Sequence, residues 1–154
     1  KQANRGIECF QLFETYAGLV PEDFYLEKIL PLSKKILNEA RLNNLPTIFF
    51  PKGLGNGLSK IDKNICDYLS VDWQMNLNHS RKIINDDVGV QGNIDPRLLY
   101  SSYNQIEKYL SDLIPFGESN HNWIINLGHG FLPDIDYKKA KFVVDWIKQT
   151  NWKR

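Results

Sequence analysis

The chain has 154 residues, of which 42% are hydrophobic and 24% charged, and its formal net charge is +1. This length suffices for one domain with a hydrophobic core, and the composition is typical of a globular chain. The near-neutral charge argues against a broad nucleic-acid surface but leaves room for a local basic pocket. No apolar run approaches the roughly 20 residues of a membrane span and no secretory signal is found, so a cytoplasmic protein is expected.

The hydrophobic pattern predicts five strands, each followed by a helical segment. The expected strands are 7–13, 46–50, 68–73, 88–93 and 123–127. The expected helices are 21–43, kinked or split at Pro31, a short one from about Ser59, then 77–84, a region from 95 that is clearest over 103–113, and 137–148. Because no two strands form a hairpin, the order predicts an α/β fold with a parallel sheet and crossover helices.

The stretch from Trp123 to Pro133 is the most informative part of the chain. It reads as a buried strand, apolar on both faces apart from Asn126, that stops at Gly128-His129-Gly130. The two glycines are expected to let the backbone turn where a side chain would clash. A histidine at the carboxyl end of a parallel strand stands where α/β barrels place their chemistry, and a loop histidine with a local hydrogen bond is the alternative.

Every predicted strand ends in a loop with polar or glycine residues, and parallel strands would bring these loops to one edge of the sheet. The loops are Glu14-Thr15, Lys52-Gly53, Asp72-Trp73, 93–95 and His129. Thr15 is expected either to offer its hydroxyl to a ligand carboxylate or to satisfy the local backbone. For Asp72 a structural role is favoured over ligand contact, and Asp95, before Pro96, is expected to cap a helix.

For the remaining glycines, cysteines and histidines, the sequence favours structural roles over functional ones. The glycine-rich segment 53–57 has neither GxGxxG nor P-loop spacing, so a plain turn between strand and helix is favoured over a phosphate cradle. Cys9 and Cys66 are expected to be reduced core residues. His79 and His121 are expected at the surface. No pair of histidines, cysteines or carboxylates has metal-ligand spacing, so no metal site is expected.

Several short blocks occur along almost the whole chain in a specific order. They are QLFETYAG at 11–18, FFPKG at 49–53, DW at 72–73, QGNIDP at 91–96 and NLGHG at 126–130, followed by Pro133. In this order and spacing they resemble the carboxyl-terminal half of the uroporphyrinogen decarboxylase family. The resemblance implies a (β/α)8 TIM barrel, of which residues 1–154 form roughly the last five strand–helix units as the carboxyl-terminal portion of the barrel domain.

The resemblance also implies a carboxy-lyase that works without a metal or organic cofactor. The family removes the carboxyl groups of the four acetate side chains of uroporphyrinogen III, giving coproporphyrinogen III in porphyrin and heme biosynthesis. It implies that His129 and Thr15 contact this small-molecule substrate, that Phe13 is an apolar pocket residue, and that the complete enzyme is a homodimer. The family's essential aspartate, its carboxylate-binding arginines and a substrate-contacting tyrosine lie in the amino-terminal half, so no catalytic residue is assigned within residues 1–154.

Without those groups the isolated chain is expected to be inactive, and five strands alone would leave an open sheet edge. The favoured interpretation is a portion of a longer enzyme of this family. Three alternatives stay open. The first is a split or decayed gene product, and the second is a noncatalytic ligand-binding or scaffold half-barrel. The third is a cobamide-dependent methyltransferase of the same superfamily, which would need a zinc-binding set of histidines and cysteines.

Overall fold

Five parallel strands form one sheet in the computed structural model, which describes residues 2–153. The strands are β1 (Phe10–Glu14), β2 (Thr47–Pro51), β3 (Tyr68–Ser70), β4 (Gly89–Gln91) and β5 (Trp123–Ile124). Their order in the sheet is their order in the chain, and every pair is parallel. This winding in one direction is that of a (β/α)8 barrel, and the predicted α/β class is confirmed.

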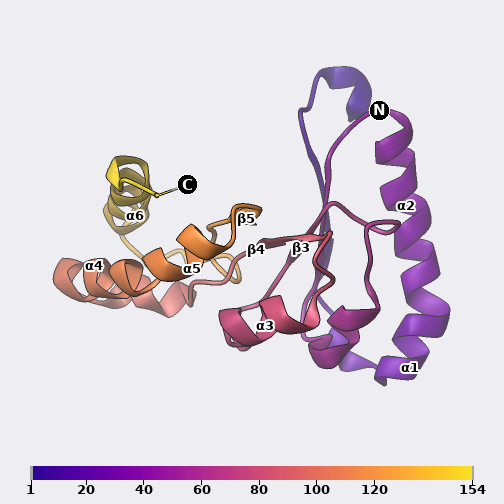
Figure 1. The fold of residues 1–154 in the computed structure, drawn as a ribbon, viewed down its shortest axis with the longest axis horizontal. Helices are drawn as coiled ribbons and strands as arrows, with labels where there is room; N and C mark the ends of the chain where they lie inside the picture. Colours follow the sequence, from indigo (N-terminus) through magenta and orange to yellow (C-terminus); the bar gives the residue numbers. More distant parts are fainter. Residues whose placement is uncertain (1, 154) are drawn as a thin grey trace.

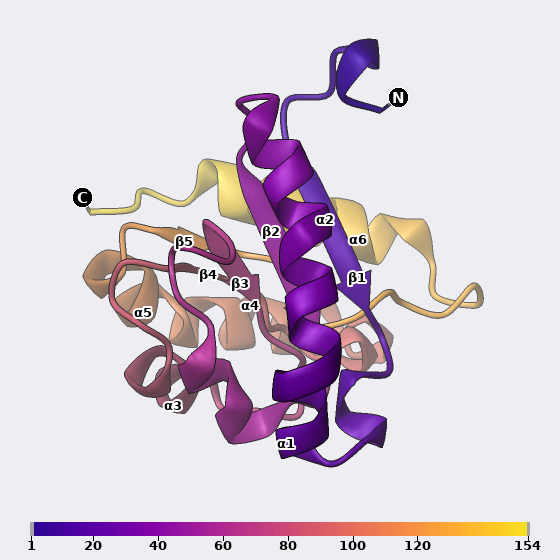
Figure 2. The same ribbon diagram turned by 90° about the vertical axis from the view of Figure 1, so that its right-hand side faces the viewer.

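A helical segment follows every strand (Figure 1). They are α1 (Glu22–Phe24), a π-helical turn (Tyr25–Ile29), α2 (Leu30–Leu42), α3 (Leu77–Ile83), α4 (Tyr103–Asp112), α5 (Ile114–Ser119) and α6 (Tyr137–Gln149). Short 3-10 helices are Ala3–Arg5, Ala17–Leu19, Gly55–Lys60 and Pro96–Tyr100. Helix α2 lies across β1 and β2 (Figure 2), whereas α4, α5 and α6 gather at the other end of the sheet.

The strands alternate between two environments, as the pleat of a β-strand requires. Phe49 of β2 and Leu69 of β3 are completely buried in the larger hydrophobic core, which also contains residues of α2 and α3. Their neighbours Phe50 and Ser70 instead line a hollow on the opposite face of the sheet. A second core around Ile106 joins α4 and α6. One face of the sheet is therefore a helix-covered core, and the other is available to a site.

Of the kink or split predicted at Pro31, the split is not observed, because the helical segment runs without interruption from Glu22 to Leu42. Pro31 lies at the start of α2, and the preceding turn is π-helical. A proline is tolerated in such a position because its missing N–H and its ring cost least where the regular hydrogen-bond pattern changes. The short helix expected from about Ser59 is a 3-10 helix that begins earlier, at Gly55.

The first and last strands differ from their predicted forms. β1 starts at Phe10 rather than at 7, since pairing with β2 begins at the Phe10–Thr47 pair. The predicted buried strand 123–127 is reduced to Trp123–Ile124, followed by an isolated bridge at Leu127. Ile124 is 37% exposed. The expectation of full burial is wrong, because β5 is the edge of the described sheet and pairs only with β4.

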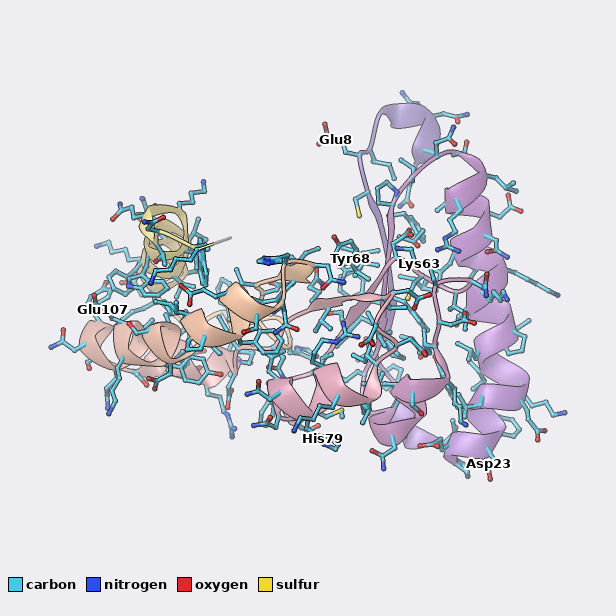
Figure 3. All side chains as sticks on the ribbon, in the orientation of Figure 1. Glu8, Asp23, Lys63, Tyr68, His79 and Glu107 are labelled. Atoms are coloured by element: carbon cyan, nitrogen blue, oxygen red, sulfur yellow. The ribbon has the colours of Figure 1, made fainter. Side chains whose placement is uncertain are left out.

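Both cysteines are free thiols, but only Cys66 is buried. Cys9 is exposed just before the first paired residue of β1, so the prediction of a second core cysteine is wrong. His79 on α3 points away from the sheet (Figure 3), and His121 is exposed as well, as expected. Within residues 2–153, no helix has the length and apolar character needed to cross a membrane.

Candidate functional site

A hollow of about 450 Å³ opens at the carboxyl edge of the sheet, on the face opposite the helix-covered core. Its lining comes from β1, β2, β3 and the loop after β5. Phe13, Thr15 and His129, the three residues that the sequence predicts to contact substrate, all lie on it. The volume is within the range of small-molecule sites. The fold thus brings together side chains from the two ends of the chain, and their role in binding stays a prediction.

The three side chains are open to whatever enters the hollow. Phe13 is 65% exposed and meets Phe50 edge to face, with 6.2 Å between the ring centroids. Thr15 is exposed, and within residues 2–153 its hydroxyl makes no hydrogen bond, so the expected alternative of local backbone contact is not observed. His129 is exposed, and its Nδ1 lies 3.3 Å from the Gly130 carbonyl oxygen, a local contact at the long end of hydrogen-bond range.

The His129 loop is held by the glycine that precedes it. The Gly128 N–H donates to the Ile94 carbonyl oxygen over 2.8 Å. A Cβ at Gly128 would lie 2.3 Å from the backbone nitrogen of Trp73, so only glycine fits this close approach. Nothing lies within 4 Å of the corresponding point at Gly130. The expectation that both glycines avoid a clash is therefore right for Gly128 and wrong for Gly130.

The loops after β2, β3 and β4 are tied to one another, as their predicted shared edge requires. The buried Asp72 carboxylate accepts hydrogen bonds from the N–H groups of Gly53 and Gln74, both at 2.9 Å. The Asn93 amide donates to the Asp72 carbonyl oxygen, also at 2.9 Å. Asp72 therefore has the structural role that the sequence favours. The Gly53 N–H is engaged within the protein, which agrees with a plain turn in the segment 53–57.

Asp95 and Arg97 form a compact unit beside this network. The Asp95 carboxylate accepts from the Arg97 N–H at 2.9 Å, so the predicted N-cap is confirmed. The Arg97 guanidinium pairs with the same carboxylate at 2.6 Å and lies 4.1 Å above the Trp73 ring. The hydrogen bonds from Arg97 lower the pKa of Asp95. The arginine charge is thus already neutralised, and His129 is the one titratable side chain among the described lining residues.

Sequence reasoning missed several residues of the lining. They are Gln11, Phe50, Ser70, Asn126 and Phe131. The signal that finds the first of them is the two-residue period of a strand, which places Gln11 on the same face as Phe13. In the sequence, Asn126 stands out only as the polar exception in its strand. Within the described part of the chain, no group of three or more histidine, cysteine or acidic side chains is arranged to hold a metal ion.

A singly wound parallel sheet with a hollow at the carboxyl ends of its strands defines a protein of the (β/α)8-barrel class. Within that class the uroporphyrinogen decarboxylase (URO-D) family matches residues 1–150. The chain belongs to this family. The resemblance drawn from the sequence blocks is confirmed.

Curated relatives agree with this assignment. A uroporphyrinogen decarboxylase of Trichlorobacter lovleyi is 34% identical over 150 residues, which cover 97% of this chain and 44% of the relative. The uroporphyrinogen decarboxylase of Francisella tularensis subsp. novicida is 34% identical, and the match covers 97% of this chain and 44% of the relative. That of Chlorobium chlorochromatii is 33% identical, and the match covers 99% of this chain and 45% of the relative. The chain therefore spans less than half the length of these relatives.

A solved structure described as a methyltransferase from Methanosarcina mazei has a similar fold. The TM-score is 0.77, and the match covers 95% of this chain and 43% of the other. At 17% sequence identity, this likeness shows the fold alone.

Proposed function

We propose that this chain supplies one wall of the substrate site of a uroporphyrinogen decarboxylase. The observation that carries the proposal is the meeting of Phe13, Thr15 and His129 in one hollow of a chain that belongs to this family. The reaction proposed for the complete enzyme is decarboxylation of the four acetate side chains of uroporphyrinogen III to methyl groups, in porphyrin and heme biosynthesis. The resemblance further supports a cytoplasmic homodimer that needs no cofactor.

The chemistry requires little beyond positioning and proton transfer. Protonation of a pyrrole carbon makes the ring an electron sink, and the bond between the acetate carboxylate and its methylene carbon then breaks. Carbon dioxide leaves, and a proton is added to the methylene carbon to give a methyl group. The ring carbon then releases the proton that it took up, which restores the aromatic pyrrole. The exposed Phe13 ring offers an apolar surface to the pyrrole, while the Thr15 hydroxyl and the His129 ring offer hydrogen bonds to its carboxylates.

The described wall accounts for only part of such a site. Several carboxylates on one substrate call for localised cationic donors, because charge-assisted hydrogen bonds are the strong ones. No lysine or arginine is among the described residues that line the hollow. The proposal therefore assigns substrate orientation to this wall and assigns no proton-donating or carboxylate-clamping residue within it.

Binding of uroporphyrin, the oxidised and fluorescent form of the substrate, tests this role of His129. It is measured with the unmatched part of the Trichlorobacter lovleyi relative supplied as a separate chain, because the described wall lacks cationic donors. Truncation in His129→Ala removes a hydrogen bond to a charged group, and such bonds contribute about 1.5–3 kcal/mol. The expected result is an affinity lower by roughly tenfold or more. The matched control is His79→Ala, an exposed histidine on α3 away from the hollow, which should bind as the unsubstituted chain does. Equal affinities for the two variants, or no binding by any form, would contradict the proposal.

The methyltransferase alternative has a direct test of its own. The fold likeness to the Methanosarcina mazei structure does not favour either activity. Elemental analysis of the purified chain distinguishes them, because a cobamide-dependent methyltransferase requires zinc. One zinc ion per chain would favour that alternative over the decarboxylase.

A further inference from the structure

The two walls of the hollow are connected behind its lining by a series of short backbone contacts. On the Thr15 side, the Gly18 N–H donates to the Lys52 carbonyl oxygen at 2.9 Å. Gly18 also packs so closely on Gly53 that a Cβ there would lie 2.5 Å from the Gly53 carbonyl oxygen. The Gly53 N–H in turn donates to Asp72 Oδ2. The loop that carries Thr15 thus rests on a turn that the Asp72 carboxylate holds.

The same carboxylate holds the other wall. Asp72 Oδ1 accepts from the Gln74 N–H at 2.9 Å and so shapes the turn that contains Trp73. The Trp73 backbone is the surface on which Gly128 packs, and His129 follows directly. Asp72 is therefore the point at which the supports of the Thr15 loop and the His129 loop meet.

The burial of this group is costly unless its oxygens are satisfied. Asp72 is 4% exposed, and each of its carboxylate oxygens accepts one backbone hydrogen bond. Asn93, which is 6% exposed, fixes the Asp72 backbone by donating to its carbonyl oxygen. If the Asp72 carboxylate served only to cap its own turn, the local bond from the Gln74 N–H would be sufficient. The bond to Gly53, 19 residues earlier, joins two separate loops instead.

We propose that Asp72 is a positioning residue of the substrate site, which sets the relative placement of the Thr15 and His129 loops. Asp72 does not line the hollow, so it acts through these loops and not by touching the substrate. The substrate half of this inference rests on the proposed decarboxylase function, whereas the coupling of the two loops does not.

Hydrogen–deuterium exchange followed by mass spectrometry tests the coupling in the 154-residue chain. In Asp72→Asn one carboxylate oxygen becomes an amide NH2 group, so the side chain can no longer accept from both Gly53 and Gln74. Exchange is expected to be about tenfold faster in both segments, 14–19 and 126–131, because the residue that joins their supports is no longer held on both sides. A second variant, Asn93→Ala, removes the anchor of the Asp72 backbone and is expected to accelerate the same two segments.

The matched control is Asp67→Asn, since Asp67 also accepts a backbone N–H but lies at the opposite end of the strands. This control should lower stability without accelerating the two segments relative to the rest of the chain. The inference is overturned if Asp72→Asn leaves either segment exchanging as it does in the control.

Uroporphyrin binding separates this inference from the function on which it partly rests. A supporting residue behind a site is expected to change affinity by roughly tenfold, so Asp72→Asn should bind that much more weakly. Absence of binding by the unsubstituted chain, tested with the same added part of the relative, would remove the proposed function, and the exchange result alone would then decide the role of Asp72. Binding by Asp72→Asn as tight as that of the unsubstituted chain would overturn the positioning role.

Discussion

Asp67 joins the amino ends of β2 and β3 through four donors. Its carboxylate accepts from the Thr47 N–H and hydroxyl, both at 2.8 Å, and pairs with Arg41 and Lys63, both at 3.2 Å. Burial acts to raise the pKa of Asp67, but the hydrogen bonds from Thr47 and the neighbouring cations outweigh it and lower the pKa from 3.8 to about 2. The ionised form is therefore favoured by the folded state.

A carboxylate whose pKa is lower in the folded state stabilises the fold above the pKa of the unfolded chain. This contribution is lost as the pH falls from 3.8 through about 2. We expect Asp67→Asn to lower the free energy of unfolding by about 2 kcal/mol at pH 7, and the difference from the unsubstituted chain to vanish near pH 2. Urea unfolding across this range measures it. Asp86→Asn, at a fully exposed carboxylate, is the control that should change little; a pH-independent loss for Asp67→Asn would contradict the linkage.

Some of the residues that line the hollow could be predicted from the sequence, whereas the contacts of Asp67 could not. Phe13, Thr15 and His129 stand in blocks with a specific order, so their shared location could be predicted. Asp67 could not, because Thr47 and Arg41 lie 20 and 26 residues away and no local pattern marks the meeting. The same holds for the bond between Asp72 and Gly53, which depends on the register of β2 against β3.

At the scale of elements, the loop after β5 contains two glycines, Gly128 and Gly130, which flank His129 but differ in how closely other atoms approach them. We expect Gly128→Ala to lower the free energy of unfolding by about 1–3 kcal/mol, the cost of forcing extra atoms into a packed site. The reason is the approach of 2.3 Å to the Trp73 backbone, which cannot move as a flexible side chain would. Gly130→Ala is the matched control and should cost far less, since no atom lies within 4 Å. Thermal melts of the two variants decide it, and equal losses would mean that the close approach is not what Gly128 provides.

Element types could be predicted better than their limits. Alternating strands and helices follow from local periodicity, and all five strands were expected. The limits of β1 and β5 depend on the neighbouring strand, so β1 begins where β2 pairs with it and β5 stops early at the sheet edge. A π-helical turn precedes the helix that contains Pro31, and no residue preference in the segment indicates it.

At the scale of the whole molecule, the described sheet is open at both of its edges. β1 pairs only with β2 and β5 only with β4, so within residues 2–153 each end of the sheet keeps one unpaired edge. Large apolar side chains at the end of β1 and in the loops after β1 and β5 are exposed. They include Phe13, Tyr16, Leu19, Phe131 and Leu132. Unpaired edges beside exposed apolar groups favour association, so the chain alone is expected to self-associate, which analytical ultracentrifugation over a concentration series measures.

The open sheet edges and the incomplete lining of the hollow both bear on the activity of the chain alone. The chain spans 44% of its Trichlorobacter lovleyi relative, and the described lining of its hollow has no lysine or arginine. We therefore expect the chain alone to convert no uroporphyrinogen to coproporphyrinogen, because the substrate carboxylates lack cationic donors. Supplying the part of that relative outside the match, fused or as a separate chain, should restore turnover and suppress self-association, since the added strands cover the open edges. The assay follows coproporphyrinogen with and without that part, and the same combination carrying His129→Ala should be slower. Turnover by the chain alone at the rate of the combination would contradict this account, because all the catalytic groups would then lie within these 154 residues.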